Sequence, residues 1–388
     1  GYADVTEERF ENARGGGVYN VQGEVTGGRG AQLVLVNVIG NYAILEGGGI
    51  FNSGDLWIDS SQILSNQAKY GGGISNSGAV YVNYSQVNEN TAGQDGGGLK
   101  STGLIDLRES QFKNNLATGD DGGGIWVDLG NSVPDVDSIF LIDCVFESNF
   151  CSSDGGGINV NFDMANPPVF MLERCIIAGN QAEDDAGGLY FDDDVEDDKV
   201  VVHMNSCQVT GNEADGDDGG AILIVDYIQL ELTNCTFVGN YSDDDGVLEV
   251  DQSTSEIIAR NCIFFENDAD DNSDGVIDSK GDVTLISCFI TDGTDRISVE
   301  DDLTTDQIWD TDDFPDIFFV DFNFSAADDA PTAEGDFRLS KHSPLINLGD
   351  STLSAGLKLD LDGNKRVSES NIDLGAYELL PLFAEGSG

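Results

Sequence analysis

The 388-residue chain is predicted to be an all-β protein, a parallel β-helix (solenoid) of roughly ten or more coils. The first indication is a recurring pattern, an apolar residue and an asparagine followed by a run of glycines. It appears about ten times, at steps of 24 to 33 residues. The second is the alternation of apolar and polar residues between copies, which is typical of strands. Repeats of this length stack on one another because each alone cannot bury its apolar face.

Short strands with tight corners are expected within each repeat. Alternation is clearest at 55–64, 78–87 and 227–237, and turn signals such as Asn52-Ser53-Gly54 follow the glycine runs closely. No amphipathic helix of useful length is found. The leucine spacing of a leucine-rich repeat is missing, and a propeller needs repeats of about 40 residues or more. A parallel β-helix therefore fits best.

The glycine runs are expected to form one corner of every coil. In "FESNFCSSDGGGINV" (146–160), for example, three glycines follow directly after Asp154. Equivalent positions of stacked coils lie roughly 4.8 Å apart, so a corner that needs positive φ or a close backbone approach needs it in each coil. We expect these glycines to shape the backbone and to do no chemistry.

Two further residue types recur in register and are expected to form columns along the solenoid. The asparagines should form a hydrogen-bonded ladder, and they include Asn149, Asn180, Asn212 and Asn240. Six cysteines recur just before or at the aromatic position of the repeat: Cys144, Cys175, Cys207, Cys235, Cys262 and Cys288. One-coil spacing with parallel side chains strains a disulfide, so we expect free, buried thiols. Cys151 lies outside this register.

The repeat "F-x-x-N" followed by "G-G-G/A-I/L" resembles that of polymorphic outer membrane proteins and related bacterial surface β-helix proteins. The end of the chain, "GDFRLSKHSPLINLGD" (335–350) and "DLDGNKRVSESNIDLGAYE" (360–378), resembles the closing segment of bacterial secreted right-handed β-helix proteins. The resemblance implies a right-handed parallel β-helix in an extracellular or cell-surface protein, with repeats over 1–300 and a closing segment over 301–388 packed on the last coils. It does not fix an activity.

The charge of −55 is concentrated in part of the chain. Residues 1–100 carry 10 acids and 5 bases, whereas 101–388 carry 62 acids and 12 bases. Such a charge excludes nucleic acid and anionic membrane surfaces as partners. No run of 18 apolar residues is present, so no membrane span is expected.

The acids gather in register just before the glycine corners, where stacked carboxylates repel one another. We expect Ca²⁺ to offset this repulsion as a structural cofactor, because it accepts irregular sets of oxygen ligands. The alternative is a solvated acidic ridge that needs only monovalent salt. The candidate ligands are Asp120, Asp121, Asp154, Asp184, Asp185, Asp217, Asp218, Asp243, Asp244 and Asp245.

Three classes of function stay open. The first, which we favour, is a non-catalytic structural or adhesive surface solenoid that assembles end to end into a fibre, because an open coil edge is a template for pairing. The second is a calcium-assisted polysaccharide lyase or hydrolase, and the third is a carbohydrate-binding module. The scattered bases and the isolated His203 and His342 indicate no catalytic residues. Carbohydrate or a host or cell-surface ligand is the expected partner, besides a second copy of the chain.

Overall fold

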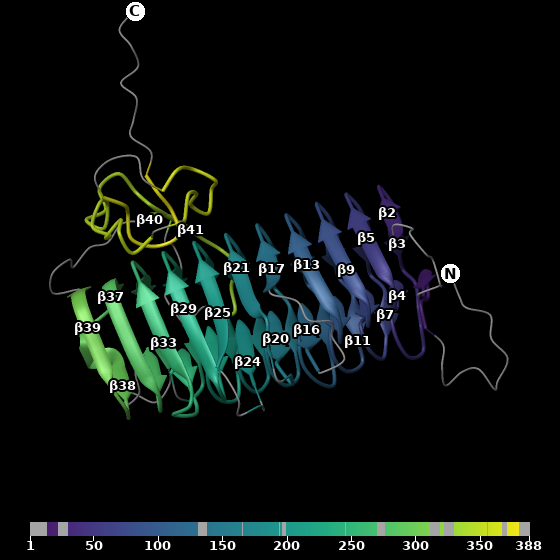
Figure 1. The fold of residues 1–388 in the computed structure, drawn as a ribbon, viewed down its shortest axis with the longest axis horizontal. Helices are drawn as coiled ribbons and strands as arrows, with labels where there is room; N and C mark the ends of the chain where they lie inside the picture. Colours follow the sequence, from purple (N-terminus) through teal and green to yellow (C-terminus); the bar gives the residue numbers. More distant parts are fainter. Residues whose placement is uncertain are drawn as a thin grey trace, which may run out of the picture.

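In the computed structural model the chain is a parallel β-solenoid of about nine turns, shown in Figure 1. The structure describes residues 14–21, 30–130, 138–164, 166–193, 195, 199–244, 246–269, 276–310, 319–321, 330–354, 356–366 and 371–379. The all-β parallel fold predicted from the repeats is confirmed, and the number of turns is slightly below the ten or more expected. The right-handed winding stays a prediction.

Three parallel sheets form the walls of the solenoid. Strands from successive coils are neighbours in each sheet. The eleven-stranded sheet consists of β1 (Val18–Asn20), β4 (Ile50–Asn52), β8 (Ile74–Asn76), β12 (Leu99–Ser101), β16 (Ile125–Asp128), β20 (Ile158–Asn161), β24 (Leu189–Asp192), β28 (Ile222–Ile224), β32 (Leu248–Val250), β36 (Ile277–Ser279) and β38 (Ile297–Val299).

The twenty-stranded sheet takes two strands from most coils. It consists of β2 (Ala31–Val34), β3 (Asn37–Ile39), β5 (Asp55–Asp59), β6 (Gln62–Leu64), β9 (Ala79–Asn83), β10 (Gln86–Asn88), β13 (Leu104–Arg108), β14 (Gln111–Lys113), β17 (Ser138–Ile142), β18 (Val145–Glu147), β21 (Val169–Glu173), β22 (Ile176–Ala178), β25 (Val200–Asn205), β26 (Gln208–Thr210), β29 (Ile228–Thr233), β30 (Thr236–Val238), β33 (Glu256–Arg260), β34 (Ile263–Phe265), β37 (Asp282–Ile290) and β39 (Leu303–Trp309).

The eight-stranded sheet is built from two-residue strands. These are β7 (Gln67–Ala68), β11 (Thr91–Ala92), β15 (Leu116–Ala117), β19 (Phe150–Cys151), β23 (Gln181–Ala182), β27 (Glu213–Ala214), β31 (Tyr241–Ser242) and β35 (Asp268–Ala269). A short 3₁₀ helix spans Gly293–Arg296, and β40 (Phe319–Asp321) pairs antiparallel with β41 (Asp336–Leu339).

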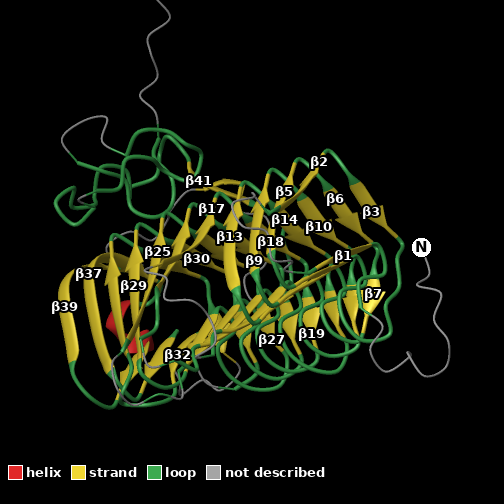
Figure 2. Cartoon of the chain, turned by 45° about the vertical axis from the view of Figure 1, so that its right-hand side comes forward, coloured by secondary structure: helices red, strands yellow, loops and turns green. Residues whose placement is uncertain are grey.

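The register between coils places equivalent residues of the repeat side by side. Ile158 pairs with Leu189, which pairs with Ile222 in the next coil. Alternate residues of each strand point into one continuous apolar core, as Leu56 and Ile58 of β5 do with no exposed surface. Figure 2 shows the stacked coils in an oblique view. The columns expected from the repeat therefore exist along the axis.

The glycine corners have two separate causes. The first glycine of a run adopts positive φ, as Gly155 does at 75°, where other residues are disfavoured. The second lies against the next coil: a Cβ on Gly156 would be 2.5 Å from the carbonyl oxygen of Gln181. In the following coil Ala186 takes the first position at a φ of 57°. The corner thus tolerates alanine at the first position more easily than at the second.

The asparagines form a buried hydrogen-bonded column. The Oδ1 of Asn180 accepts hydrogen bonds from the backbone N–H and the Nδ2 of Asn149, at 3.0 and 2.9 Å. The Nδ2 of Asn149 also donates to the carbonyl of Phe112 in the preceding coil. The same side-chain bond links each successive pair among Asn41, Asn66, Asn90, Asn115, Asn149, Asn180, Asn212, Asn240 and Asn267. The column satisfies polar groups in the interior of every coil that it crosses.

The cysteines are all free and buried. In their column the backbone N–H of Cys175 donates to the Sγ of Cys207 at 3.5 Å, and the Sγ of Cys175 donates to the carbonyl of Leu141. Burial raises the pKa of the Cys175 thiol, so this group stays protonated. The remaining members are Cys144, Cys235, Cys262 and Cys288, and Ser61, Ser85 and Ser110 hold the equivalent position in earlier coils.

Cys151 lies outside this column. It is in the eight-stranded sheet, where it packs between Ala117 and Ala182.

The C-terminal residues pack on the outer face of the twenty-stranded sheet, as Figures 1 and 2 show for the region around β41. A second apolar cluster joins Leu374 and Tyr377 to Val238 and Ile263 of the sheet. The fully buried Arg366 donates to the carbonyls of Gly375 and Ala376. Strands β38 and β39 still extend the solenoid beyond residue 300. The division at residue 300 stays a prediction.

No helix among the described residues has the length and apolar character that a membrane crossing requires.

Candidate cation site at the acidic corners

The acidic loops lie at the corner between the eight-stranded and the eleven-stranded sheets. In several coils an acid stands directly before the corner, as Asp154 and Asp185 do. The backbone N–H of Asp154 donates to the Oδ1 of Asp121 at 3.2 Å, and that of Asp185 donates to the Oδ1 of Asp154 at 3.3 Å. Asp218 repeats the contact with Asp185 at 3.2 Å. These acids therefore form a carboxylate column parallel to the asparagine column.

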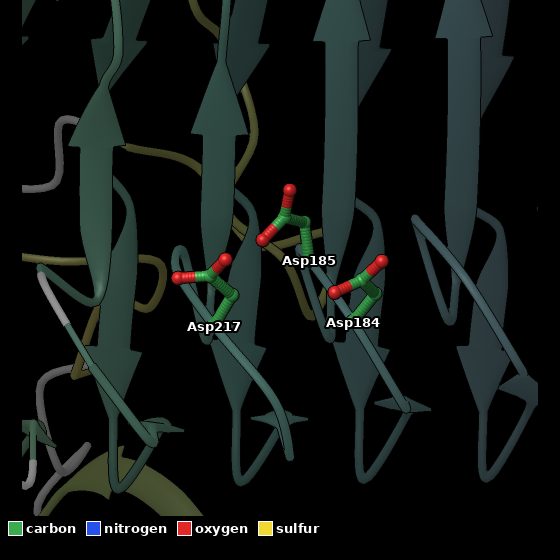
Figure 3. A group of neighbouring side chains, drawn as sticks. All are labelled: Asp184, Asp185 and Asp217. Carbon is green, nitrogen blue, oxygen red and sulfur yellow. The ribbon is translucent and has the colours of Figure 1, made fainter.

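Two groups of three carboxylates bridge neighbouring coils. One oxygen each of Asp184, Asp185 and Asp217 lie within 4.8 Å of one another, as Figure 3 shows. The same holds for Asp217, Asp218 and Asp244. Asp217 belongs to both groups, so the two share a central carboxylate. Oxygen atoms at this spacing can be brought into contact with one hard cation between them.

The pKa values of several aspartates at the corner are raised, which means that the ionised carboxylates are disfavoured there. Burial raises the pKa of Asp154 to about 7, and the carboxylates of Asp121 and Asp185 add like-charge repulsion. Burial likewise raises the pKa of Asp185 to about 6, with repulsion from Asp217 and Asp184. The pKa values of Asp120, Asp121 and Asp217 are also raised, again by burial first. The protein alone thus disfavours full ionisation of this column at neutral pH.

Basic side chains do not neutralise the first group. Among the ion pairs of the described residues, none includes Asp184, Asp185, Asp217 or Asp244. One base does lie at the N-terminal end of the acidic loops. Lys100 pairs with Asp95, and its charge lowers the pKa of Asp120 against the larger effect of burial. Bases thus pair with acids in earlier coils, as Lys100 does, and in later coils, as Arg296 does with Asp268, but none of the described ion pairs includes a member of the first group.

The structure does not bring all the predicted ligands together. Asp120, Asp121 and Asp154 belong to no group of three metal-ligating side chains among the described residues. Asp243 is also outside these groups, and its Oδ1 accepts a hydrogen bond from the hydroxyl of Tyr241. Asp245 lies outside the described residues.

Two residues near the acidic corner were not anticipated. Burial, with Asp215 and Asp243, raises the pKa of Glu213 to about 7. Burial and the charges of Asp192, Asp154 and Asp185 raise the pKa of Tyr190 as well. Both follow from register: Glu213 and Tyr190 stand on β27 and β24, the strands on either side of the acidic corner. Their side chains could have been assigned to this corner by extending the column argument into the strands.

The donor set favours a hard divalent cation. The candidate ligands are carboxylate oxygens, which suit Ca²⁺ and Mg²⁺, whereas Zn²⁺ sites usually include histidine or cysteine. Ca²⁺ accepts six to eight oxygens in irregular geometry, and Mg²⁺ needs a near-ideal octahedron. Three carboxylates from two loops of unequal length match the irregular coordination of Ca²⁺ better than the octahedron of Mg²⁺.

Comparison with protein-family models, with curated proteins and with solved structures gives no match to this chain.

Proposed function

We propose that the chain is a non-catalytic, extracellular structural or adhesive solenoid of a bacterial surface, stabilised by Ca²⁺ on its stacked aspartate loops. The observation that carries the cation part is the group formed by Asp184, Asp185 and Asp217, whose oxygens lie within 4.8 Å of one another. No described base forms an ion pair with any of the three. The resemblance of the repeat to right-handed bacterial surface β-helices supports the location.

Calcium in this role joins one coil to the next. Asp184 and Asp185 precede β24, whereas Asp217 precedes β28, so a cation held by all three links two turns of the solenoid. Binding to the folded state alone raises stability by about 2.7 kcal/mol per site when free ligand is 100 times Kd. A repeat protein gains from such links because each coil is held only by its neighbours. An extracellular location supplies the millimolar calcium that weak sites of this type need.

End-to-end assembly is the second part of the proposal. At one end Val34 and Leu35 are 52% and 79% exposed, and at the other end Leu303 is 41% exposed. Among the described strands, β39 pairs only with β37, so its second edge is available to another strand. Exposed apolar residues beside such an edge favour pairing with a second copy.

Electron microscopy of the purified protein with and without calcium tests this assembly. We expect linear particles several times the length of one solenoid in calcium, and their loss when Leu35→Lys and Leu303→Lys place charges at the two ends. Tyr84→Lys, at a residue 59% exposed on the side wall, is the matched control and should leave the particles intact. Dispersed monomers of the unsubstituted protein in both conditions would rule assembly out.

A further inference from the structure

A groove lies on the outer face of the twenty-stranded sheet, on the side covered by the C-terminal residues. Its main part has a volume of about 580 Å³ and lies between β21, β25, β29 and β33 and the segment around Thr352 and Leu357. A second hollow of about 430 Å³ lies between residues 109–111, Asp143, Val145 and Arg174 of the sheet and Leu359 with Gly363. Both sizes fall in the range of small-ligand sites. Neither hollow includes the acidic corner.

The register explains why polar side chains gather in this groove. Outward-pointing residues of successive coils form one row of Met171, His203 and Glu231. A second row contains Glu173, Asn205, Thr233 and Arg260. Residues far apart in the sequence thus form one polar surface, and His203, which looked isolated in the sequence, lies at its centre.

Glu231 is the central acceptor of this surface. Its Oε2 lies 3.5 Å from His203 Nδ1 and 3.4 Å from Arg260 Nη1, and its Oε1 accepts a hydrogen bond from Gln229 Nε2 at 2.7 Å. The three side chains remain accessible, with 28%, 24% and 25% of His203, Glu231 and Arg260 exposed. Solvent-facing donors and acceptors are therefore held in fixed positions next to one another.

The hydrogen-bond donors and acceptors of the groove suit a ligand with hydroxyl groups better than a charged ligand. Carboxylates only accept hydrogen bonds, guanidinium only donates, and amides do both, whereas each sugar hydroxyl both donates and accepts. Within the groove Arg260 and Glu231 already offset each other, so no net positive charge remains to hold an anion. The net charge of −55 repels polyanions from the whole molecule. A neutral polyhydroxylated ligand meets neither obstacle.

The shape of the groove indicates a linear ligand. Glu173, Asn205, Thr233 and Arg260 line the groove and form one continuous row across three coil steps. At about 4.8 Å per step the row is about 14 Å long. An extended peptide would instead bind at an open strand edge. The strands β21, β25, β29 and β33 beneath the groove are paired on both sides, so they offer no such edge.

We propose that this groove binds a linear, neutral polysaccharide, with His203, Glu231 and Arg260 as the main hydrogen-bonding residues. This binding site goes beyond the structural role of the solenoid and needs no catalysis. It does not involve the calcium site, because the groove and the acidic corner share no residue.

Affinity electrophoresis in native gels tests the proposal. The probes are four neutral polymers, namely dextran, mannan, laminarin and xylan, and two acidic ones, polygalacturonate and heparin. We expect retardation by at least one neutral polymer and by neither acidic one. Glu231→Gln and His203→Ala should each weaken the binding about tenfold, the loss expected for a hydrogen bond to a charged group. His342→Ala removes the other histidine of the chain from an exposed position and should bind normally.

Three results would overturn the proposal. They are no retardation by any of the four neutral polymers, equal retardation by the acidic polymers, and unchanged binding in both groove variants. Thermal unfolding of each variant checks that the solenoid is intact. His203 and Glu231 are both partly exposed on the outer face, so neither substitution should disturb the apolar core.

Discussion

Replacement of Gly156 by alanine is expected to lower the free energy of unfolding by about 3 kcal/mol, the upper range for inserting atoms into a packed site. A Cβ at this position would lie 2.5 Å from the carbonyl oxygen of Gln181 and 2.6 Å from that of Gly187. Both contacts are to backbone of the next coil, which cannot rotate away as a side chain could. Two coils would have to separate to admit one methyl group.

Gly130→Ala is the matched control, because a Cβ on Gly130 meets nothing within 4 Å. Its effect should stay within about 0.5 kcal/mol, as for an ordinary surface substitution. Urea unfolding followed by far-UV circular dichroism at fixed calcium concentration measures both variants. Equal midpoints for Gly156→Ala and Gly130→Ala would mean that the coils are not packed at the corner as described.

In the absence of divalent cations, the free energy of unfolding is expected to fall as pH rises from about 4 to 7. The pKa of Asp154 is raised to about 7 and that of Asp185 to about 6, both mainly by burial. Between the ordinary value of about 3.9 and these raised values, the folded state holds more protons than the unfolded chain. The free energy of unfolding therefore falls with rising pH in this window.

Calcium should reverse this loss at pH 7.5 and have less effect at pH 4.5, where Asp154 and Asp185 hold protons. Melting temperatures in EDTA and in millimolar Ca²⁺ across this range measure both effects. The double variant Asp154→Asn with Asp185→Asn should flatten the profile in EDTA, whereas Asp301→Asn with Asp302→Asn, an exposed acidic pair, should not. Equal recovery with NaCl of the same ionic strength would favour the solvated acidic ridge.

The fold could be predicted because its cause is local and repeated. The glycine at 155 needs positive φ, and the asparagine at 180 needs a partner one coil away, and both needs recur in nearly every coil. Periodicity alone therefore identified the corner, the asparagine column and the thiol column. Handedness does not follow from these contacts, because the same columns form in either winding.

The grouping of the acids could not be read from the sequence. The loop before β28 (215–221) is one residue longer than the loop before β24 (183–188). Asp217 meets Asp184 and Asp185, whereas Asp243 belongs to no group of three among the described residues. Sequence register gives the corner on which a carboxylate lies, but the direction of each side chain decides which oxygens lie within 4.8 Å of one another.

The groove was missed for a different reason. Its second wall comes from residues near Thr352, which bear no periodic relation to His203 and Glu231. A weak signal for this covering segment was present in the glycines. Gly179 and Gly211 adopt positive φ at a turn where other coils have Ser65 or Glu89, and a Cβ on either glycine would meet the backbone of Thr332. Glycine at these two turns leaves room for the backbone of Thr332, but glycine alone does not identify a covered coil, because Gly40 holds the equivalent turn with nothing within 4 Å of its Cβ position.

The most direct test of the account is isothermal titration of chelator-treated protein with Ca²⁺ at pH 7.5, compared with Asp217→Asn and Asp301→Asn. Asp217 belongs to both three-carboxylate groups, whereas Asp301 lies exposed outside them. The account predicts saturable calcium binding that Asp217→Asn weakens at least tenfold and Asp301→Asn leaves unchanged. No saturable binding, or equal binding by the two variants, would contradict it.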